Sequence, residues 1–132
     1  MDEKALLGSI IDLARTLGWK VAHTPPVLAS VRGGGKRWMT PVQADGKGFP
    51  DLLLVRERVL AVEVKGGNHK PTPEQADWLA AFRIAGCHAF VWTPRDWADE
   101  TVHAELARRD RRDPVVVVGY DMRSLAEMNA TG

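Results

Sequence analysis

Two apolar runs on either side of a short charged turn constrain the fold of this chain more than any other feature. Residues 48–67 read GFPDLLLVRERVLAVEVKGG, and the runs are 51–55 and 59–64. Each run is apolar on both of its faces, so both faces must be covered. We therefore expect the runs to pair as central strands of a sheet, joined by a hairpin turn at residues 56–58.

The acidic residues of this hairpin stand at the end opposite the turn. If the hairpin is symmetric about Glu57, Asp51 faces Glu63 across the ladder, with β-carbons about 5 Å apart. Side chains alternate along a strand, so Lys65 lies on the same face as Glu63. Two carboxylates this close repel, and one of them would take up a proton unless something compensates.

A divalent cation would remove this repulsion. Oxygen ligands, water in the remaining positions and space for a phosphate suit Mg²⁺ or Mn²⁺, and the backbone carbonyl of Val64 adds a ligand to Asp51 and Glu63. Lys65 would then orient or deprotonate a water, or stabilise charge on the phosphate. The alternative is a solvated ion pair across the strands, which contributes under about 1 kcal/mol.

Helices and further strands are expected around the hairpin. Thr72, Pro73 and Gln75 have the spacing of a capping box, which starts a helix that should end at Gly86. The strands before and after this helix would form a parallel βαβ unit, and the whole pattern predicts an α/β fold with a mixed central sheet flanked by helices. In chain order the expected elements are a helix ending at Gly18, strands at 19–23, 51–55 and 59–64, the capped helix, a strand at 88–92, a helix at about 96–109, an edge strand at 115–118 and a short helix after Tyr120.

Composition indicates one cytoplasmic domain. The chain has 132 residues, 45% of them apolar, which suits a single core. Its net charge of +1 does not by itself indicate a nucleic-acid or membrane partner, so electrostatic arguments depend on local clusters. The single cysteine, Cys87, excludes an intramolecular disulfide. No signal-peptide core and no apolar run of membrane-spanning length is present in the sequence, so we expect a cytoplasmic protein.

An ordered set of short motifs resembles a known nuclease family. The motifs are Pro50-Asp51, Glu63-Val64-Lys65, Pro73-Glu74-Gln75-x-x-Trp78, Gly86 and Val91-Trp92. Together they look like the PD-(D/E)XK nuclease superfamily and, within it, the VRR-NUC group of virus-type replication-repair nucleases, in its small stand-alone form from phages and bacteria. The resemblance covers roughly residues 3–97. It implies a restriction-endonuclease-like core with elements in αβββαβ order.

The resemblance also implies roles for individual residues. Asp51 and Glu63 would be metal ligands, Lys65 the catalytic lysine, and Gln75 would lie beside the site while also serving the capping box. The family usually adds a glutamate from its first helix. We favour Glu3, which heads the apolar stripe, over Asp12 on the polar face. A charge that only suits the helix dipole is the alternative role for Glu3.

The implied activity is that of a Mg²⁺-dependent or Mn²⁺-dependent DNA endonuclease. Such enzymes hydrolyse phosphodiester bonds, several of them in four-way junctions or flaps, during replication, recombination or repair in a bacterium or a phage-infected host, and stand-alone forms are commonly homodimers. Residues 1–132 would form a single nuclease domain, with its core at about 3–97 and a C-terminal helix, edge strand and tail at 98–132. The alternatives are a catalytically inactive DNA-binding module of the same fold and, less favoured, a structural subunit of a phage particle.

Cations that would contact DNA cluster in the segment 24–50, which is rich in Pro and Gly. We expect a long loop there, with a β excursion around 37–42, and three glycines at 33–35 whose amides can approach phosphates. A flexible, solvated loop is the alternative. Trp38 is the tryptophan expected to touch DNA, whereas Trp78 and Trp92 should pack in the core, and His69 is a weaker candidate for approaching the substrate. The expected DNA-binding residues are Arg32, Lys36, Arg37, Lys47 and Lys70.

Overall fold

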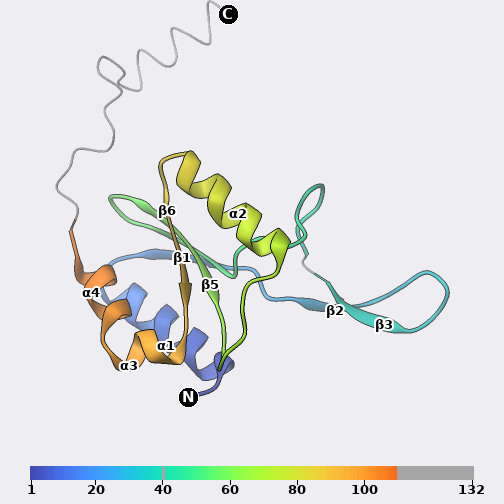
Figure 1. The fold of residues 1–132 in the computed structure, drawn as a ribbon, viewed down its shortest axis with the longest axis horizontal. Helices are drawn as coiled ribbons and strands as arrows, with labels where there is room; N and C mark the ends of the chain where they lie inside the picture. The colour runs from blue at the N-terminus through green and yellow to red at the C-terminus, as the bar shows by residue number, and fades with distance from the viewer. Residues whose placement is uncertain (40, 110–132) are drawn as a thin grey trace, which may run out of the picture.

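The fold is taken from a computed structural model that describes residues 1–39 and 41–109 (Figure 1). A mixed four-stranded sheet in the order β1-β4-β5-β6 forms its centre, with β1, β4 and β5 antiparallel neighbours and β5 parallel to β6. Helices flank this sheet, which confirms the expected α/β fold class. The elements are α1 (Glu3–Thr16), β1 (Lys20–His23), β2 (Val27–Ser30), β3 (Lys36–Met39), β4 (Leu52–Val55), β5 (Val59–Val64), α2 (Pro73–Ile84), β6 (His88–Trp92), α3 (Pro94–Ala98) and α4 (Thr101–Ala107).

The β4–β5 hairpin has the register that symmetry about Glu57 predicts. Leu52 pairs with Val62, and the pairing continues without a bulge to the turn. One further step along the ladder, beyond the last paired position, brings Asp51 opposite Glu63. The predicted hairpin and its register are therefore confirmed, and so is the parallel βαβ unit formed by β5, α2 and β6.

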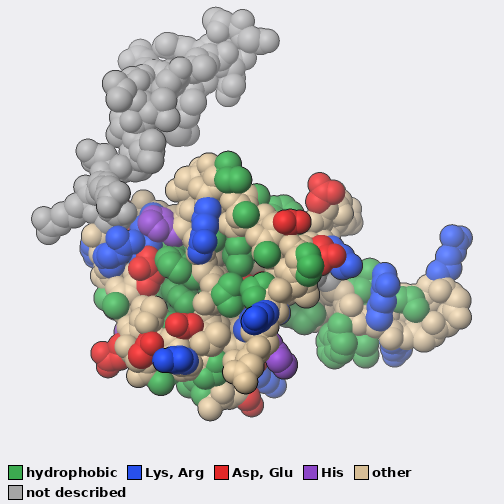
Figure 2. Space-filling model, viewed as in Figure 1, with side chains coloured by type: hydrophobic (Ala, Val, Ile, Leu, Met, Phe, Trp, Pro, Cys, Tyr) green, Lys and Arg blue, Asp and Glu red, His purple; other side chains and the backbone are tan. Residues whose placement is uncertain are grey.

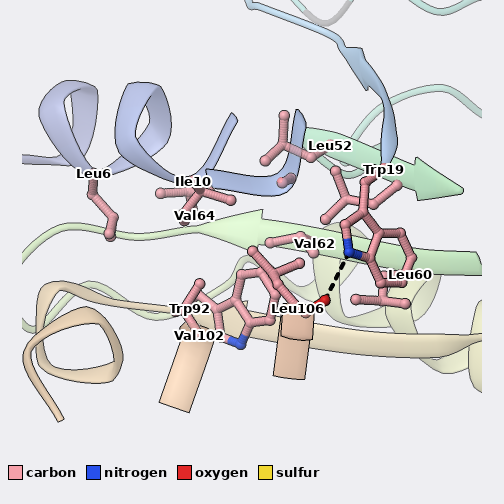
Figure 3. Close-up of a cluster of buried hydrophobic side chains, with 12 residues drawn as sticks. Leu6, Ile10, Trp19, Leu52, Leu60, Val62, Val64, Trp92, Val102 and Leu106 are labelled. Carbon is pink, nitrogen blue, oxygen red and sulfur yellow. Dashed lines mark hydrogen bonds between the residues drawn. The ribbon is translucent and has the colours of Figure 1, made fainter. Parts of the chain in front are cut away.

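Side-chain alternation along β5 divides the core into two layers. Leu60, Val62 and Val64 point to the face covered by α1 and α4, where the larger apolar cluster lies (Figure 3). The opposite face carries a smaller cluster under α2 that includes Ala61. Because Glu63 follows Ala61 by two positions, its side chain lies on the α2 face. The site is thus built on the side of the sheet with less apolar cover.

The charged turn of the hairpin joins the sheet to two helices. The Arg56 guanidinium carbon lies 4.4 Å from the ring centroid of Trp19, and Arg56 Nη1 donates to the carbonyl oxygen of Leu17 at 2.9 Å. Arg58 Nη1 donates to Oε1 of Glu105 at 2.7 Å. Cation–π contact and charge-assisted hydrogen bonds therefore fasten the ends of α1 and α4 to this end of the sheet. These arginines serve the fold, at the end of the hairpin away from Asp51.

The helix expected at 96–109 is divided into α3 and α4. The backbone N–H and the hydroxyl of Thr93 donate to Oδ2 of Asp96 at 2.8 and 3.0 Å, and these bonds start α3 earlier than expected. Glu100 has φ +65°, in the left-handed region, which a continuous right-handed helix does not contain. The prediction of one helix is therefore wrong. The edge strand expected at 115–118 and the helix after Tyr120 lie outside the described residues.

The segment between β1 and β4 contains a second hairpin, which projects from the body of the protein (Figure 1). β2 and β3 pair antiparallel, with Leu28 opposite Trp38. The glycines at 33–35 form its turn, and all have positive φ between +83° and +97°, which residues with a β-carbon rarely adopt. β3 overlaps the expected excursion at 37–42, whereas the sequence did not indicate β2. Within the described part of the chain, no helix is long and apolar enough to cross a membrane.

Candidate active site

Three ionisable side chains meet where β4 begins and β5 ends. Asp51 Oδ2 accepts a hydrogen bond from the backbone N–H of Val64 at 2.8 Å, and the Asp51 carboxyl interacts directly with that of Glu63. Lys65 Nζ lies 3.6 Å from Glu63 Oε1. Glu63 is only 2% exposed, whereas Asp51 and Lys65 are half-buried and can reach solvent. The groups singled out from the sequence are thus brought together at one end of the sheet.

The capping box of α2 fixes the fourth group of the site. Thr72 accepts the backbone N–H of Gln75 at 3.2 Å, and Gln75 Oε1 accepts the backbone N–H of Thr72 at 2.8 Å. Because the amide oxygen is used in this way, Nε2 faces the buried Glu63 and donates to its Oε1 at 3.0 Å. The predicted capping box is confirmed, and the same side chain also orients a carboxylate of the site.

Glu63 is electrostatically strained in the absence of a cation. Burial, and after it the neighbouring Asp51 carboxyl, raise the pKa of Glu63 to about 8, because Lys65 lowers this pKa by less than Asp51 raises it. Glu63 Oε1 is used by Gln75 and Lys65, but Oε2 is buried and has no hydrogen-bond partner among the described residues. A buried carboxylate oxygen without a partner costs about 1–3 kcal/mol or more. A cation bound at Oε2 would remove both penalties.

The donor set fits a hard divalent cation. The described residues contain no group of three or more His, Cys, Asp and Glu side chains that could enclose a metal ion. Two carboxylates, with the Val64 main chain held against Asp51, instead leave several coordination positions for water and a phosphate. Mg²⁺ prefers such an arrangement, because it keeps several waters and uses one or two carboxylates with substrate oxygens. Mn²⁺ accepts the same oxygen ligands.

Comparison with known protein families assigns the chain to a family. A model of the VRR-NUC domain matches residues 27–96, just over half of the chain. The chain belongs to the VRR-NUC family. It therefore carries a nuclease domain of the PD-(D/E)XK type, for which DNA is the substrate and divalent-metal dependence is general. The matched segment contains Asp51, Glu63, Lys65 and Gln75, together with the β2–β3 hairpin. Neither a curated protein nor a solved structure matches the chain significantly.

The glutamate expected from the first helix does not join Asp51 and Glu63 in the candidate site. Glu3 is exposed at the start of α1, where a β-carbon on Gly66 would lie 3.2 Å from Glu3 Cβ. This contact packs the start of α1 against the turn that follows Lys65. However, α1 covers the face of the sheet opposite Glu63, and Glu3 does not form a three-carboxylate group with the others in the described residues. Its role as a ligand stays a prediction, and Asp12 is exposed on α1.

The cations expected to bind DNA lie mainly on the β2–β3 hairpin and the loop that follows it. Figure 2 shows basic side chains spaced along the projecting hairpin. Lys47 Nζ lies 3.4 Å from Oε1 of Glu74 on α2, and both side chains are well exposed, so this pair contributes little and can be exchanged for a phosphate. The residues Arg32, Lys36, Arg37, Lys47 and Lys70 are all exposed, as is His69.

Trp92 lies in the core and Trp38 on the surface, as the sequence predicts, whereas Trp78 packs outside both apolar clusters. Trp92 is 2% exposed within the larger apolar cluster. Trp78 is half-buried, with its Nε1 donating to the carbonyl oxygen of Asp45 at 3.0 Å and its ring centroid 5.0 Å from that of Phe49. Trp38, by contrast, is 69% exposed on β3. It is available to a ligand, and the other two are used in packing.

Sequence reasoning missed one residue that positions the site. Gly48 has φ +82°, and a β-carbon there would lie 2.6 Å from the carbonyl carbon of Glu74 and 2.7 Å from the backbone nitrogen of Gln75. Real β-carbons do not approach other atoms so closely, so glycine is required for the loop to pass the first turn of α2. The only signal in the sequence was a glycine shortly before Pro50, and nothing local indicated its contact with α2.

Proposed function

We propose that this VRR-NUC protein is a Mg²⁺-dependent endonuclease that hydrolyses phosphodiester bonds in DNA, with Mn²⁺ able to replace Mg²⁺. The observation that carries the proposal is the buried Glu63 carboxyl, whose Oε2 has no hydrogen-bond partner among the described residues and which lies beside Asp51 and Lys65. A carboxyl held in this state is poorly suited to a purely structural role, because burial penalises its charge. Its environment suits the binding of a cation.

Each residue of the site has a separate task in this proposal. Asp51, Glu63 and the carbonyl of Val64 would hold the cation, which when bound would stabilise phosphate charge as a Lewis acid and make a water more acidic. The ammonium of Lys65, which the site holds beside Glu63, orients the attacking water and stabilises the charge that develops on the phosphate. Gln75 keeps Glu63 in place through Oε1, so that Oε2, which has no hydrogen-bond partner among the described residues, would be the ligand atom. The water forms a new P–O bond as the leaving oxygen departs.

The finer parts of the proposal extend to the DNA and to the assembly. We infer a preference for branched DNA, either four-way junctions or flaps, in replication, recombination or repair in a bacterium or a phage-infected cell. Paired cuts across a junction require two sites, which suits a homodimer. The exposed cations Arg32, Lys36, Arg37, Lys47 and Lys70 would bind the DNA backbone. Family membership and the exposed charge of the hairpin support these points.

The test is a cleavage assay on labelled linear, nicked, flap and four-way DNAs in Mg²⁺, Mn²⁺ or EDTA. We expect cleavage only with metal, and a loss of at least about a hundredfold in the Lys65→Ala variant, the range typical of a lost charge-stabilising group. Lys20→Ala is the matched control, because Lys20 is exposed at the other end of the sheet. Metal-independent activity, or full activity in Lys65→Ala, contradicts the proposal. Salt-sensitive binding without cleavage of any substrate would identify a DNA-binding module instead.

A further inference from the structure

A cleft lies between the base of the β2–β3 hairpin and the first turn of α2. Its volume is about 460 Å³. Arg37, Trp38 and Met39 of β3 line one side, Val42 and Lys47 of the following loop continue the wall, and Gln75 lies at the α2 side. The cleft therefore combines an aromatic surface and cations with a residue that also hydrogen bonds to Glu63. Figure 2 shows hydrophobic and basic side chains together on this hairpin.

We propose that this cleft binds an unpaired nucleotide of the DNA strand beside the scissile phosphate, with its base stacked on Trp38. This inference rests on the proposed function and adds to it a binding site for one unpaired base, formed by the cleft and Trp38. Arg37 and Lys47 would contact the phosphates that flank the stacked base. Base stacking on an aromatic ring combined with a positively charged groove is the usual way in which proteins bind single-stranded nucleic acid.

The exposure of Trp38 favours a ligand over a structural role. Trp38 is 69% exposed and its cross-strand neighbour Leu28 is 52% exposed, so neither is covered by the rest of the described protein. The hairpin has only two strands, and removing such a large apolar ring from water would stabilise it. A stacked base would supply this cover. Stacking on Trp38 would also accept any of the four bases, because every base has an aromatic face.

The dimensions of the cleft favour an unpaired strand over a duplex. A volume of about 460 Å³ lies within the range of pockets that hold a small ligand and is far below that of a segment of double helix. Bases in a duplex present their edges in the grooves, whereas their faces are covered by neighbouring base pairs. Only an unpaired or extruded base can offer its face to Trp38.

Gln75 connects the cleft to the active site. Its side chain lines the cleft, and its Nε2 donates to Glu63 Oε1 at 3.0 Å. A nucleotide held against Trp38 would therefore lie close to the residues around Glu63. The ion pair between Lys47 and Glu74 borders the same cleft, and because both side chains are well exposed, a DNA phosphate can compete for Lys47.

Binding measured in EDTA tests the inference without cleavage. The probe is a duplex with a single-stranded flap that carries 2-aminopurine in its first unpaired position, compared with the same sequence fully paired. We expect 2-aminopurine quenching with the flap, and a loss of flap affinity of about 5–100-fold in Trp38→Ala. Trp38→Phe should recover most of the affinity, because it keeps an aromatic face. The affinity for the paired duplex should change less than twofold in either variant.

Leu28→Ala is the matched control, because Leu28 is the exposed partner of Trp38 on the same hairpin and does not line the cleft. It should leave flap affinity unchanged, and circular dichroism should show all variants folded. Flap affinity that is unaffected by Trp38→Ala, or reduced equally for flap and paired DNA, overturns the inference. Trp38-dependent flap binding without cleavage in Mg²⁺ would refute the proposed function and leave this inference standing. Cleavage of the flap that requires Lys65 but is unchanged in Trp38→Ala would support the proposed function and refute this inference.

Discussion

Replacing Glu63 with Gln should stabilise the metal-free protein at alkaline pH. Burial, with the nearby Asp51 carboxyl, raises the pKa of Glu63 from 4.5 to about 8. The unfolded chain therefore loses this proton near pH 4.5, whereas the folded protein keeps it until the pH approaches 8. Below pH 4.5 the carboxyl is protonated in both states, so it does not lower the free energy of unfolding. Folding stability falls progressively as the pH rises through this window, because the folded state binds more protons than the unfolded state. Glutamine has a similar shape and cannot be charged, so the Glu63→Gln variant avoids the loss.

The size of the effect follows from the shift in pKa. The pKa differs by about 3.5 units, from 4.5 to about 8. This difference sets an upper limit of about 5 kcal/mol on how much the ionisation of Glu63 can lower the free energy of unfolding. Water at the half-buried rim of the site screens part of this penalty, so we expect a gain of about 2–3 kcal/mol above pH 8. The variant loses the contact with Lys65 at 3.6 Å, but it keeps an Oε1 acceptor for Gln75.

Urea unfolding in EDTA at pH values of about 5, 7 and 9 measures this gain. The midpoint of Glu63→Gln should exceed that of the wild type by about 1 M at the highest pH and by much less at the lowest. Asp12→Asn, which changes an exposed carboxylate on α1, should show no such pH dependence. Mg²⁺ should raise the wild-type midpoint at pH 9 and leave the variant nearly unchanged, because only the folded wild type offers the full site. Equal midpoints at pH 9 without metal would refute the argument that burial keeps this carboxyl protonated.

Three further predictions concern other parts of the molecule. Gly48→Ala should displace the start of α2 and reduce the rate of cleavage at least about tenfold, with little change in DNA affinity. Gly86→Ala is the control in the same kinetic assay, because Gly86 also has a positive φ but has no atom near the new methyl group. Arg58→Ala should lower the free energy of unfolding by about 3 kcal/mol in urea titrations, because the Glu105 carboxylate loses its buried ion-pair partner. The variant should still cleave DNA at low temperature. Replacing Arg32, Lys36 and Arg37 together with Ala should reduce the slope of log affinity against log salt by about three, and an unchanged slope would exclude the hairpin from the DNA interface.

The parts of the fold that the sequence predicts are those determined by local chemistry. The register of the β4–β5 hairpin follows from the apolar pattern and the short turn, because a shift by one residue would turn every core side chain to the wrong face. The start of α2 follows from Thr72 and Gln75, whose hydrogen bonds lie within one turn of helix. The same register places Asp51, Glu63 and Lys65 at one corner of the sheet from the sequence alone.

The parts that could not be predicted depend on contacts between distant segments or on weak patterns. β2 and β3 form a two-stranded hairpin exposed on both faces, so no burial pattern marks β2 in the sequence. The break between α3 and α4 depends on Glu100 in a left-handed conformation, which glutamate seldom adopts and which no sequence rule signals. The contact of Gly48 with α2 joins two segments that only the tertiary fold brings together.

The two ends of the β4–β5 hairpin have different roles, one in stability and the other in the candidate site. At the turn, Arg56 and Arg58 stack on Trp19 and fasten α1 and α4 to the sheet. At the open end, Glu63 is held where its charge is unfavourable without a cation. The register between these ends is enforced by core residues such as Leu52 and Val62, which alternate with the acids along the same strands. The site can therefore carry an electrostatic penalty without losing its geometry, since the residues that position the carboxylates are not those that bear the penalty.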